Sequence, residues 1–527
     1  MNKLRLIFLF FLVLMLLPIL RYYDLSLERD RFLSASEIRS KVTEVSFLPR
    51  LKIVDRNGNQ LALDILRETL LFKNEIDKNI VLQLAIEENV AIFLNANRRL
   101  WFENDIDITF LKKAKNACDC NPIQEMRSRR YYPYGSITST VVGFSGTDGG
   151  LEGVERVYNT ELSEIEFSRS FIRSRKGSKT VGDLEDFYSS NPQKNLKLTL
   201  DITLQYKLFD ELKTAISSSR AKGGYAVIID AKSGDILAMA SYPTFNPNNA
   251  SRKIERNRLI DDFYEPGSLI KPFTIAGAIE YDLIKEDTII DTNPGCITLS
   301  GYKRCEAGGK NFGKIFPRDV IINSSQVGTA IISLKFSDQE IVENLKNFGF
   351  GEQLNMSWTT DYKGLILNRP RLYEIDKASL GYGYSMAANS LQIARAYTVF
   401  ANKGYMIEPK IILSDTPIKT KVLEEDIANY ILEALRDVVL VGTAENLEQG
   451  TVHIAGKTGT AEKYVEGVGH QKGKYLSSFA SIFPYEDPKY IMIVTIDEPD
   501  PNNYFGGDIA APVVIEMSNF MKRLKFL

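Results

Sequence analysis

Ser268 and Lys271 are the residues whose types and spacing most directly suggest chemistry. They lie three positions apart in FYEPGSLIKPF, directly after the turn signal Pro266-Gly267. Apolar side chains recur at helical spacing as far as Ile284, which predicts that both residues lie near a helix N-terminus and share one face. A serine there could attack a carbonyl, with free amides stabilising the oxyanion, if a lysine of lowered pKa took its proton.

The ordinary alternative for this segment is a capped helix. Serine is a common N-cap. The Ser-x-x-Lys spacing also recurs at Ser219 to Lys222 and at Ser300 to Lys303, where nothing else supports catalysis. Taken alone, FYEPGSLIKPF therefore favours the structural interpretation.

Two further segments hold residues that would complement a serine and a lysine. HIAGKTGTAEK places Lys457, Thr458 and Gly459 beside a predicted strand. A cation and a hydroxyl there could hold a carboxylate, the glycine would allow close approach of a ligand, and an extended peptide could add to the strand edge. DVIINSSQVGTAII offers Ser324 and Gln326 between apolar runs. Alone, the first segment would be a polar hairpin turn and the second a helix cap.

The composition excludes several classes of protein. The chain has only two histidines, His453 and His470, which argues against a Ser-His-Asp enzyme and against a His-rich metal site. The net charge of -2 gives no overall argument for a nucleic-acid partner. Cys296 and Cys305 flank a short loop that a disulfide could close, and the sequence leaves this open.

The N-terminus predicts a membrane anchor. Lys3 and Arg5 precede an unbroken apolar run from Leu6 to Leu20, which Arg21 ends. A cleaved signal peptide is the alternative, but no small-residue cleavage site follows the run. The positive charge before the run places the N-terminus in the cytoplasm and the bulk of the chain outside it.

The predicted elements divide the rest of the chain in two. Residues 26–195 include a hairpin signal, LKIVDRNGNQLALDI, and end in a polar stretch, 177–195. From residue 196, LKLTLD alternates like a strand, ITLQYKLFDELKTAI has helical spacing, and GGYAVIIDAKSGDILAMASY predicts two strands. SSFASIFPYEDPKYIMIVTIDEP predicts another hairpin and APVVIEMSNFMKRLKFL a closing helix. Strands at both ends with helices between them predict an α+β domain over 196–527.

Together and in this order, the three segments resemble the Ser-x-x-Lys, Ser-x-Asn and Lys-Thr-Gly motifs of penicillin-binding proteins and serine β-lactamases. AVIIDAKSGDILAMASYPTFNPN, GYGYSMAANSLQIARAYTVFANKG and VVLVGTAENL are similar to their surroundings in that family. PRLKIVDRNGNQLA, RRYYPYG and GGLEGVERVYN resemble motifs of the N-terminal pedestal in class B penicillin-binding proteins. On these motifs the chain is identified as a member of that class, a membrane-anchored monofunctional transpeptidase.

The resemblance implies catalytic roles. Ser268 would attack the penultimate D-Ala carbonyl of a stem peptide and release the terminal D-Ala, and Lys271 would take the proton of the serine. Ser324 would relay protons to the leaving group. Lys457 would support this relay and help to lower the pKa of Lys271. An amine of a neighbouring stem peptide would resolve the acyl-enzyme, and β-lactams would acylate the same serine.

The resemblance also implies how substrate is bound. Thr458 and Thr460 would bind the substrate carboxylate beside Gly459, and the backbone amides of Ser268 and Thr460 would form the oxyanion hole. Gln326 stands where the family usually has Asn. Its carboxamide could still bind the substrate amide, although the extra methylene shifts that group by about 1 Å, and misplacements of this order can cost roughly 100-fold in rate. No metal or organic cofactor is implied.

The family fold has an anchor, here 1–25, an elongated mixed pedestal, 26–195, and a transpeptidase domain, 196–527. In the last, helices cover both faces of an antiparallel sheet beside an all-helical part. Glu265 and GYGYSM look more like the division-type than the elongation-type enzymes. The division type implies a polytopic glycosyltransferase of the shape, elongation, division and sporulation family and other divisome membrane proteins as partners, and lipid-linked nascent glycan among its substrates. A non-catalytic scaffold and a β-lactamase are the less favoured alternatives.

Overall fold

In a computed structural model, the chain forms two compact units, each defined by its internal contacts. One comprises Met1–Leu51 and Ser163–Lys194, and the other Lys52–Leu162 and Asn195–Leu527. The boundaries expected between anchor, pedestal and transpeptidase domain, at residues 25 and 195, stay a prediction. The residues described are 2–27, 41–48, 50–71, 75–88, 92–95, 99–102, 108–118, 123–146, 149–163, 165–173, 179–180, 195–249, 254–356, 363–445, 447, 450–465 and 467–527.

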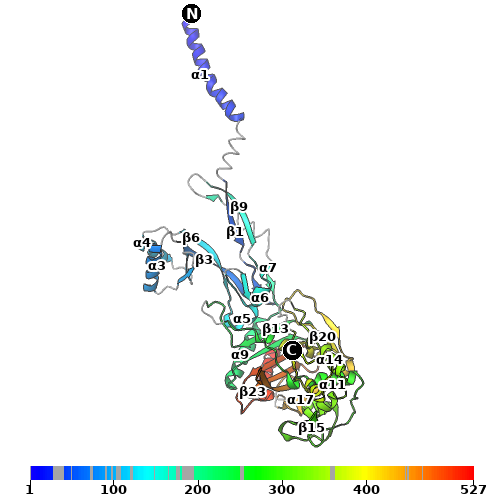
Figure 1. The fold of residues 1–527 in the computed structure, drawn as a ribbon. Helices are drawn as coiled ribbons and strands as arrows, with labels where there is room; N and C mark the ends of the chain where they lie inside the picture. The colour runs from blue at the N-terminus through cyan, green and yellow to red at the C-terminus, as the bar shows by residue number, and fades with distance from the viewer. Residues whose placement is uncertain are drawn as a thin grey trace. The chain divides into compact units, whose positions relative to one another are not determined.

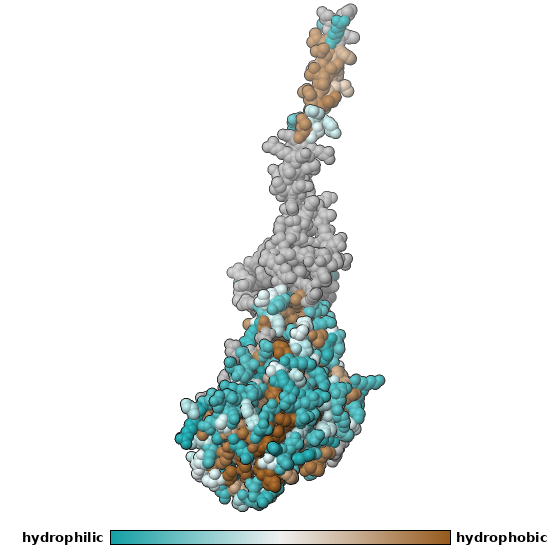
Figure 2. Space-filling model, turned by 90° about the vertical axis from the view of Figure 1, so that its right-hand side faces the viewer, coloured by the Kyte–Doolittle hydropathy of each residue, from teal (hydrophilic) through white to brown (hydrophobic). Residues whose placement is uncertain are grey.

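The first unit contains the apolar helix α1, Asn2–Leu27. Its segment Arg5–Leu27 has 23 residues and a mean hydropathy of 2.3, and none of it is buried. Figure 2 shows an almost continuous apolar surface along this helix. It is long and apolar enough to cross a membrane. The unit also has a three-stranded antiparallel sheet. Its strands are β1 (Lys41–Leu48), β9 (Ile165–Arg173) and β10 (Lys179–Thr180). Most of the predicted polar stretch, 181–194, lies outside the described residues.

The second unit begins with the predicted hairpin, which is confirmed. Strands β2 (Ile53–Val54) and β3 (Gln60–Leu71) are antiparallel across the Asn-Gly turn, where Asp55 accepts hydrogen bonds from the backbone amides of Asn57 and Asn59. β2 and β3 belong to a six-stranded sheet. Its other strands are β4 (Ile92–Asn95), β5 (Arg99–Phe102), β6 (Ile123–Tyr131) and β11 (Leu196–Lys197). Helices α3 (Glu75–Glu87) and α4 (Ile108–Ala117) follow β3 and β5.

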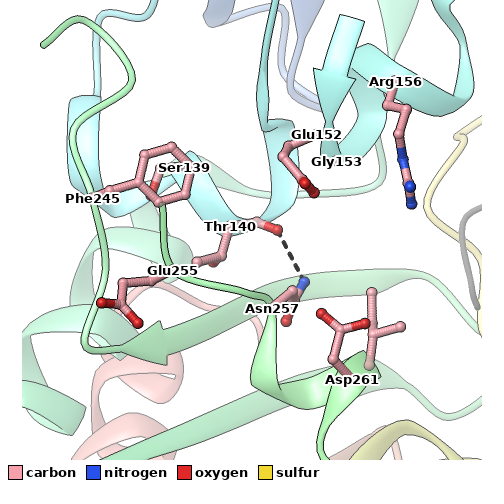
Figure 3. A pocket seen from close by; sticks show the side chains of 10 residues that line it. Ser139, Thr140, Glu152, Gly153, Arg156, Phe245, Glu255, Asn257 and Asp261 are labelled. Carbon is pink, nitrogen blue, oxygen red and sulfur yellow. Dashed lines mark hydrogen bonds between the residues drawn. The ribbon is translucent and has the colours of Figure 1, made fainter. Parts of the chain in front are cut away.

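Two of the pedestal-like motifs meet in a buried ion pair. Arg130 Nε, from RRYYPYG, lies 2.6 Å from Glu155 Oε1, from GGLEGVERVYN, and neither side chain is more than 4% exposed. The second motif contains the short helix α6 (Gly153–Val157), and another short helix, α5 (Ser139–Val142), follows the first motif. Asn257 Nδ2 donates to the Thr140 carbonyl at 3.0 Å, which ties α5 to the segment ahead of Ser268 (Figure 3).

The core of the transpeptidase-like part is a five-stranded antiparallel sheet, and the predicted strands at both ends of the domain meet in it. Its order is β13 (Ile236–Tyr242), β12 (Gly223–Asp230), β24 (Tyr490–Asp497), β23 (Gly469–Phe483) and β22 (Ala455–Val465). The predicted strand LKLTLD is shorter than expected, because Asp201 already caps the helix α9, Ile202–Ser218.

Helices cover both faces of this sheet. α9 and the closing helix α19, Ala511–Arg523, pack against each other and against the sheet, with Gly224 of β12 facing Ile216 of α9. The next residue, Tyr225, points to the opposite face and contacts Tyr264, whose hydroxyl lies 3.3 Å from Ser390 of α16, Ser390–Ala401. The predicted α+β architecture is therefore confirmed.

The helical part holds the helix that follows Ser268. This helix, α11 (Lys271–Glu280), packs with α13 (Gln326–Ser333), α14 (Asp338–Asn347) and α17 (Glu425–Leu440) (Figure 1). The ring of Phe273, on the first turn of α11, is fully buried among four aromatic rings at centroid distances of 4.9 to 5.3 Å. They belong to Phe348, Phe350, Tyr397 and Phe400. Burial of a phenylalanine stabilises by about 1.5 to 3 kcal/mol, which holds the start of α11 in place.

Candidate active site

Ser268 lies in a tight turn just before a helix, as predicted. The turn is a 3₁₀ helix, η2 (Gly267–Leu269), and α11 begins at Lys271. The N-cap position of α11 is Ile270, and no side chain caps it. Ser268 is therefore not the helix cap of the structural alternative, and its half-buried hydroxyl is left for other contacts.

Two hydrogen bonds hold this turn, one from the GYGYSM segment and one from α16. Gly267 donates its amide to the Gly383 carbonyl at 3.0 Å, and the Tyr397 hydroxyl donates to the Leu269 carbonyl at 2.9 Å. Gly383 has φ +85, and a Cβ there would lie 2.1 Å from the Gly267 carbonyl oxygen. Only glycine fits this position, so the segment can approach the turn closely.

Lys457, Thr458, Gly459 and Thr460 lie within strand β22, at the edge of the five-stranded sheet. The hairpin-turn alternative for this segment is therefore wrong. A Cβ on Gly459 would lie 2.9 Å from Leu269 Cγ. Gly459 therefore allows the serine turn to approach β22 closely.

Thr458 and Thr460 are two residues apart in the strand, so their side chains lie on one face. Thr458 Oγ1 lies 2.8 Å from Thr443 Oγ1, and Thr460 Oγ1 accepts a hydrogen bond from the Gly506 amide at 3.3 Å. Thr443 was not singled out from the sequence. Its only signal was its place in VVLVGTAENL, one of the family-like stretches.

Lys271, at the start of α11, contacts Ser324, in the turn that precedes α13. Lys271 Nζ donates to the Ser324 carbonyl at 2.5 Å and to Ser324 Oγ at 3.2 Å. Ser324 has φ +53, a left-handed conformation that costs a non-glycine residue on the order of 1 to 3 kcal/mol. The helix cap that was the alternative for this segment exists, but it is Ser325, whose hydroxyl accepts from the Gly328 amide at 2.8 Å, and not Ser324. Gln326 is the first residue of α13.

Burial controls the protonation of both lysines. Lys271 is 2% exposed, and burial lowers its pKa to about 7, against the opposing effect of Glu306. Lys457 is fully buried; burial first, and then the charge of Lys271, lower its pKa well below the usual range. Burial is the first cause of the lowered pKa of Lys271, and the expected contribution of Lys457 stays a prediction.

His470 contacts the segment that carries Ser268. The sequence had suggested no role for this residue, because the small number of histidines was used only as an argument against histidine-based catalysis and metal binding. His470 Nε2 lies 2.6 Å from Glu265 Oε2, and Glu265 Oε1 accepts from the Ser385 amide at 2.9 Å. This pair ties the β22–β23 hairpin to the serine turn. The open question about Cys296 and Cys305 is also answered, since they form a disulfide.

The pocket in Figure 3 is separate from this site. It is lined by α5, by residues 152–156 and by the segment ahead of Ser268, and no predicted site residue belongs to it. Its side chains include the carboxylates of Glu152, Glu255 and Asp261.

We expect Gly459→Ala to slow acylation of Ser268 by about 10-fold or more, because the new methyl group would push β22 away from the serine turn. The second-order rate of labelling by a fluorescent penicillin measures this. Gly450→Ala is the matched control, since its Cβ would meet no atom closer than 3.5 Å. Equal rates for the two variants would contradict the packing argument.

Comparisons with known proteins agree with this geometry. Residues 224–519 match the model of the penicillin-binding protein transpeptidase domain. A probable peptidoglycan D,D-transpeptidase PbpC of Pseudomonas aeruginosa is 31% identical over 482 residues, 87% of this chain and 84% of that protein. The peptidoglycan D,D-transpeptidase FtsI of Buchnera aphidicola is 29% identical over 98% of this chain and 94% of its own.

Among solved structures, penicillin-binding protein 3 of Mycobacterium tuberculosis, complexed with aztreonam, has a TM-score of 0.69 at 24% identity, covering 91% of this chain and 97% of that one. This likeness supports the fold, and the family match covers more than half of the chain. The chain therefore belongs to the penicillin-binding protein transpeptidases, in the class B branch that its motifs predict.

Proposed function

We propose that the chain is a serine-type peptidoglycan D,D-transpeptidase that cross-links stem peptides through an acyl-enzyme at Ser268. The observation that carries this proposal is Lys271, a buried lysine with a pKa of about 7, one turn from the serine and bonded to Ser324. A base with a pKa near the working pH is effective in proton transfer. The names of its curated relatives support the same reaction.

In the acylation step, Ser268 Oγ attacks the carbonyl carbon of the penultimate D-Ala, and neutral Lys271 takes the hydroxyl proton. The bond to the terminal D-Ala nitrogen then breaks. Ser324, which contacts Lys271, passes a proton to that nitrogen, so D-Ala leaves as a neutral amine. Lys457 supports this transfer from beside Lys271.

Substrate binding uses the edge of β22. The stem peptide adds to the free edge as a further strand, with its carboxylate held by the hydroxyls of Thr458 and Thr460 beside Gly459. Gln326 binds the substrate amide. The amides of Ser268 and Thr460, on segments that pack together, stabilise the oxyanion.

In the second step, an amine of a neighbouring stem peptide attacks the ester, which gives the cross-link and restores Ser268. β-Lactams acylate the same serine by imitating the D-Ala-D-Ala end. No metal or organic cofactor takes part in the proposed reaction.

Helix α1 anchors the chain in the cytoplasmic membrane, with the N-terminus in the cytoplasm and the bulk outside it. We assign the chain to division, on the likeness of Glu265 and GYGYSM to division-type enzymes, which fits the FtsI name of the Buchnera relative. The partner is then a polytopic glycosyltransferase of the shape, elongation, division and sporulation family, contacted through the anchor and the pedestal, 26–195.

Depletion of the chain in its own cells should produce filaments, because septal wall would no longer be cross-linked. Cell shape under the microscope is the measurement. Rounded cells would instead support the elongation-type alternative.

The acylation rate should rise with pH about a midpoint near 7, since Lys271 accepts a proton only in its neutral form. Labelling of the detergent-solubilised full chain by a fluorescent penicillin, from about pH 5 to about pH 9, measures this. Ser268→Ala is the control and should take no label. A wild-type chain that takes no label would support the non-catalytic scaffold, and rapid loss of the label would support the β-lactamase.

Gln326→Asn should raise the acylation rate if the longer side chain is a handicap, by up to about 100-fold if the displacement is near 1 Å. The same labelling assay, at a fixed pH above 7, measures the difference. An unchanged rate would show that the site accommodates the extra methylene.

A further inference from the structure

Glu306 is a buried carboxylate beside the candidate active site. Neither its sequence context nor the proposed reaction assigns it a role. It is 4% exposed. Its Oε2 accepts from the Gln326 amide at 2.7 Å, and its Oε1 accepts from the Ser325 hydroxyl at 2.5 Å and from the Val327 amide at 3.3 Å. All three donors belong to the segment that begins α13.

These contacts occupy the N-terminus of α13, where the backbone amides have no acceptor within the helix and a negative charge is favoured. Ser325 connects Glu306 to the first turn of α13. Its hydroxyl donates to Glu306 and accepts from the Gly328 amide at 2.8 Å, so the hydroxyl has a single orientation. Ser324 immediately precedes this capped turn and Gln326 begins it, so Glu306 fixes the backbone on both sides of Ser325.

Glu306 is itself held from a separate part of the chain. It directly follows Cys305, at the end of a hairpin formed by β15 (Cys296–Leu299) and β16 (Tyr302–Cys305). The Cys296–Cys305 disulfide closes this hairpin. The Glu306 amide donates to the Gly295 carbonyl at 2.9 Å, and its own carbonyl accepts from the Gly309 amide at 3.1 Å. Both the backbone and the side chain of Glu306 are therefore fixed.

The same carboxylate acts on Lys271 through space. Its negative charge raises the pKa of Lys271, against the larger lowering by burial. Without this charge, the lysine would lose its proton at a lower pH. Glu306 thus acts on the two groups that meet in the Lys271–Ser324 contact, on one through the backbone and on the other through its charge.

We propose that Glu306 is a positioning residue for the transpeptidase reaction, which fixes Ser324 against Lys271 and holds the backbone of Gln326 from a disulfide-closed hairpin. It does not touch the reacting atoms. This inference rests on the roles proposed for Lys271, Ser324 and Gln326.

The test is the pH profile of penicillin labelling for Glu306→Gln in the detergent-solubilised full chain. This variant keeps the shape of the side chain and removes the charge. We expect the maximal rate to fall by about 10- to 100-fold, because Ser324 and Gln326 shift. We also expect the acid limb to move below the wild-type midpoint of about 7, because Lys271 loses a nearby negative charge.

Asp201→Asn is the matched control. Asp201 is also 4% exposed and also caps a helix, α9, by accepting from the amides of Thr203 and Leu204. Its loss should reduce stability without moving the acid limb. If Glu306→Gln behaves in the same way, or keeps the wild-type profile, Glu306 is at most a stabilising cap and the proposal is overturned.

Glu306→Asp keeps the charge and shortens the reach, so it decides the matter if Glu306→Gln does not fold. We expect a lower maximal rate with the acid limb at the wild-type position, and a wild-type rate would overturn the proposal. A wild-type chain that takes no label would instead refute the proposed function itself, so the two failures are distinguishable.

Discussion

The burial of two lysines side by side is the constraint on which the rest of the site depends. Lys271 is 2% exposed and Lys457 is fully buried. An ammonium group taken out of water costs several kcal/mol, so burial disfavours the charged form of both lysines. This cost gives Lys271 a neutral form at physiological pH, and the surrounding packing must offset it.

That packing comes from elements that are rigid for independent reasons. The start of α11 is fixed by the ring of Phe273 among its aromatic neighbours, and Lys457 is fixed because β22 pairs along its length with β23. The serine turn lies between these elements, and two glycines, Gly383 and Gly459, allow the backbones to approach it closely. The turn therefore has little freedom to move away from Lys271.

The sequence identified the parts of this arrangement that recur as local motifs. Ser268, Lys271 and the edge strand with Lys457 were predicted because short spacings and strand or helix patterns report local structure. The contact between Gly267 and Gly383 was not predictable in this way, since it joins segments far apart in the chain without any periodic signal. The depth at which the two lysines are buried was also not predictable from the motifs. A motif implies proximity, whereas the lowering of each lysine's pKa depends on how deeply its side chain is buried.

The same reasoning bears on Gln326, the position that departs from the family pattern. Its backbone amide is bonded to Glu306, and the adjoining Ser325 is completely buried, so the backbone cannot slide to compensate for a longer side chain. The extra methylene must then be absorbed by the side-chain rotamer or by the substrate. A rotamer change costs on the order of 1 kcal/mol, less than the penalty of a 1 Å misplacement of a reacting group, about 2.7 kcal/mol at 100-fold in rate. The side chain is therefore the place where the adjustment costs less.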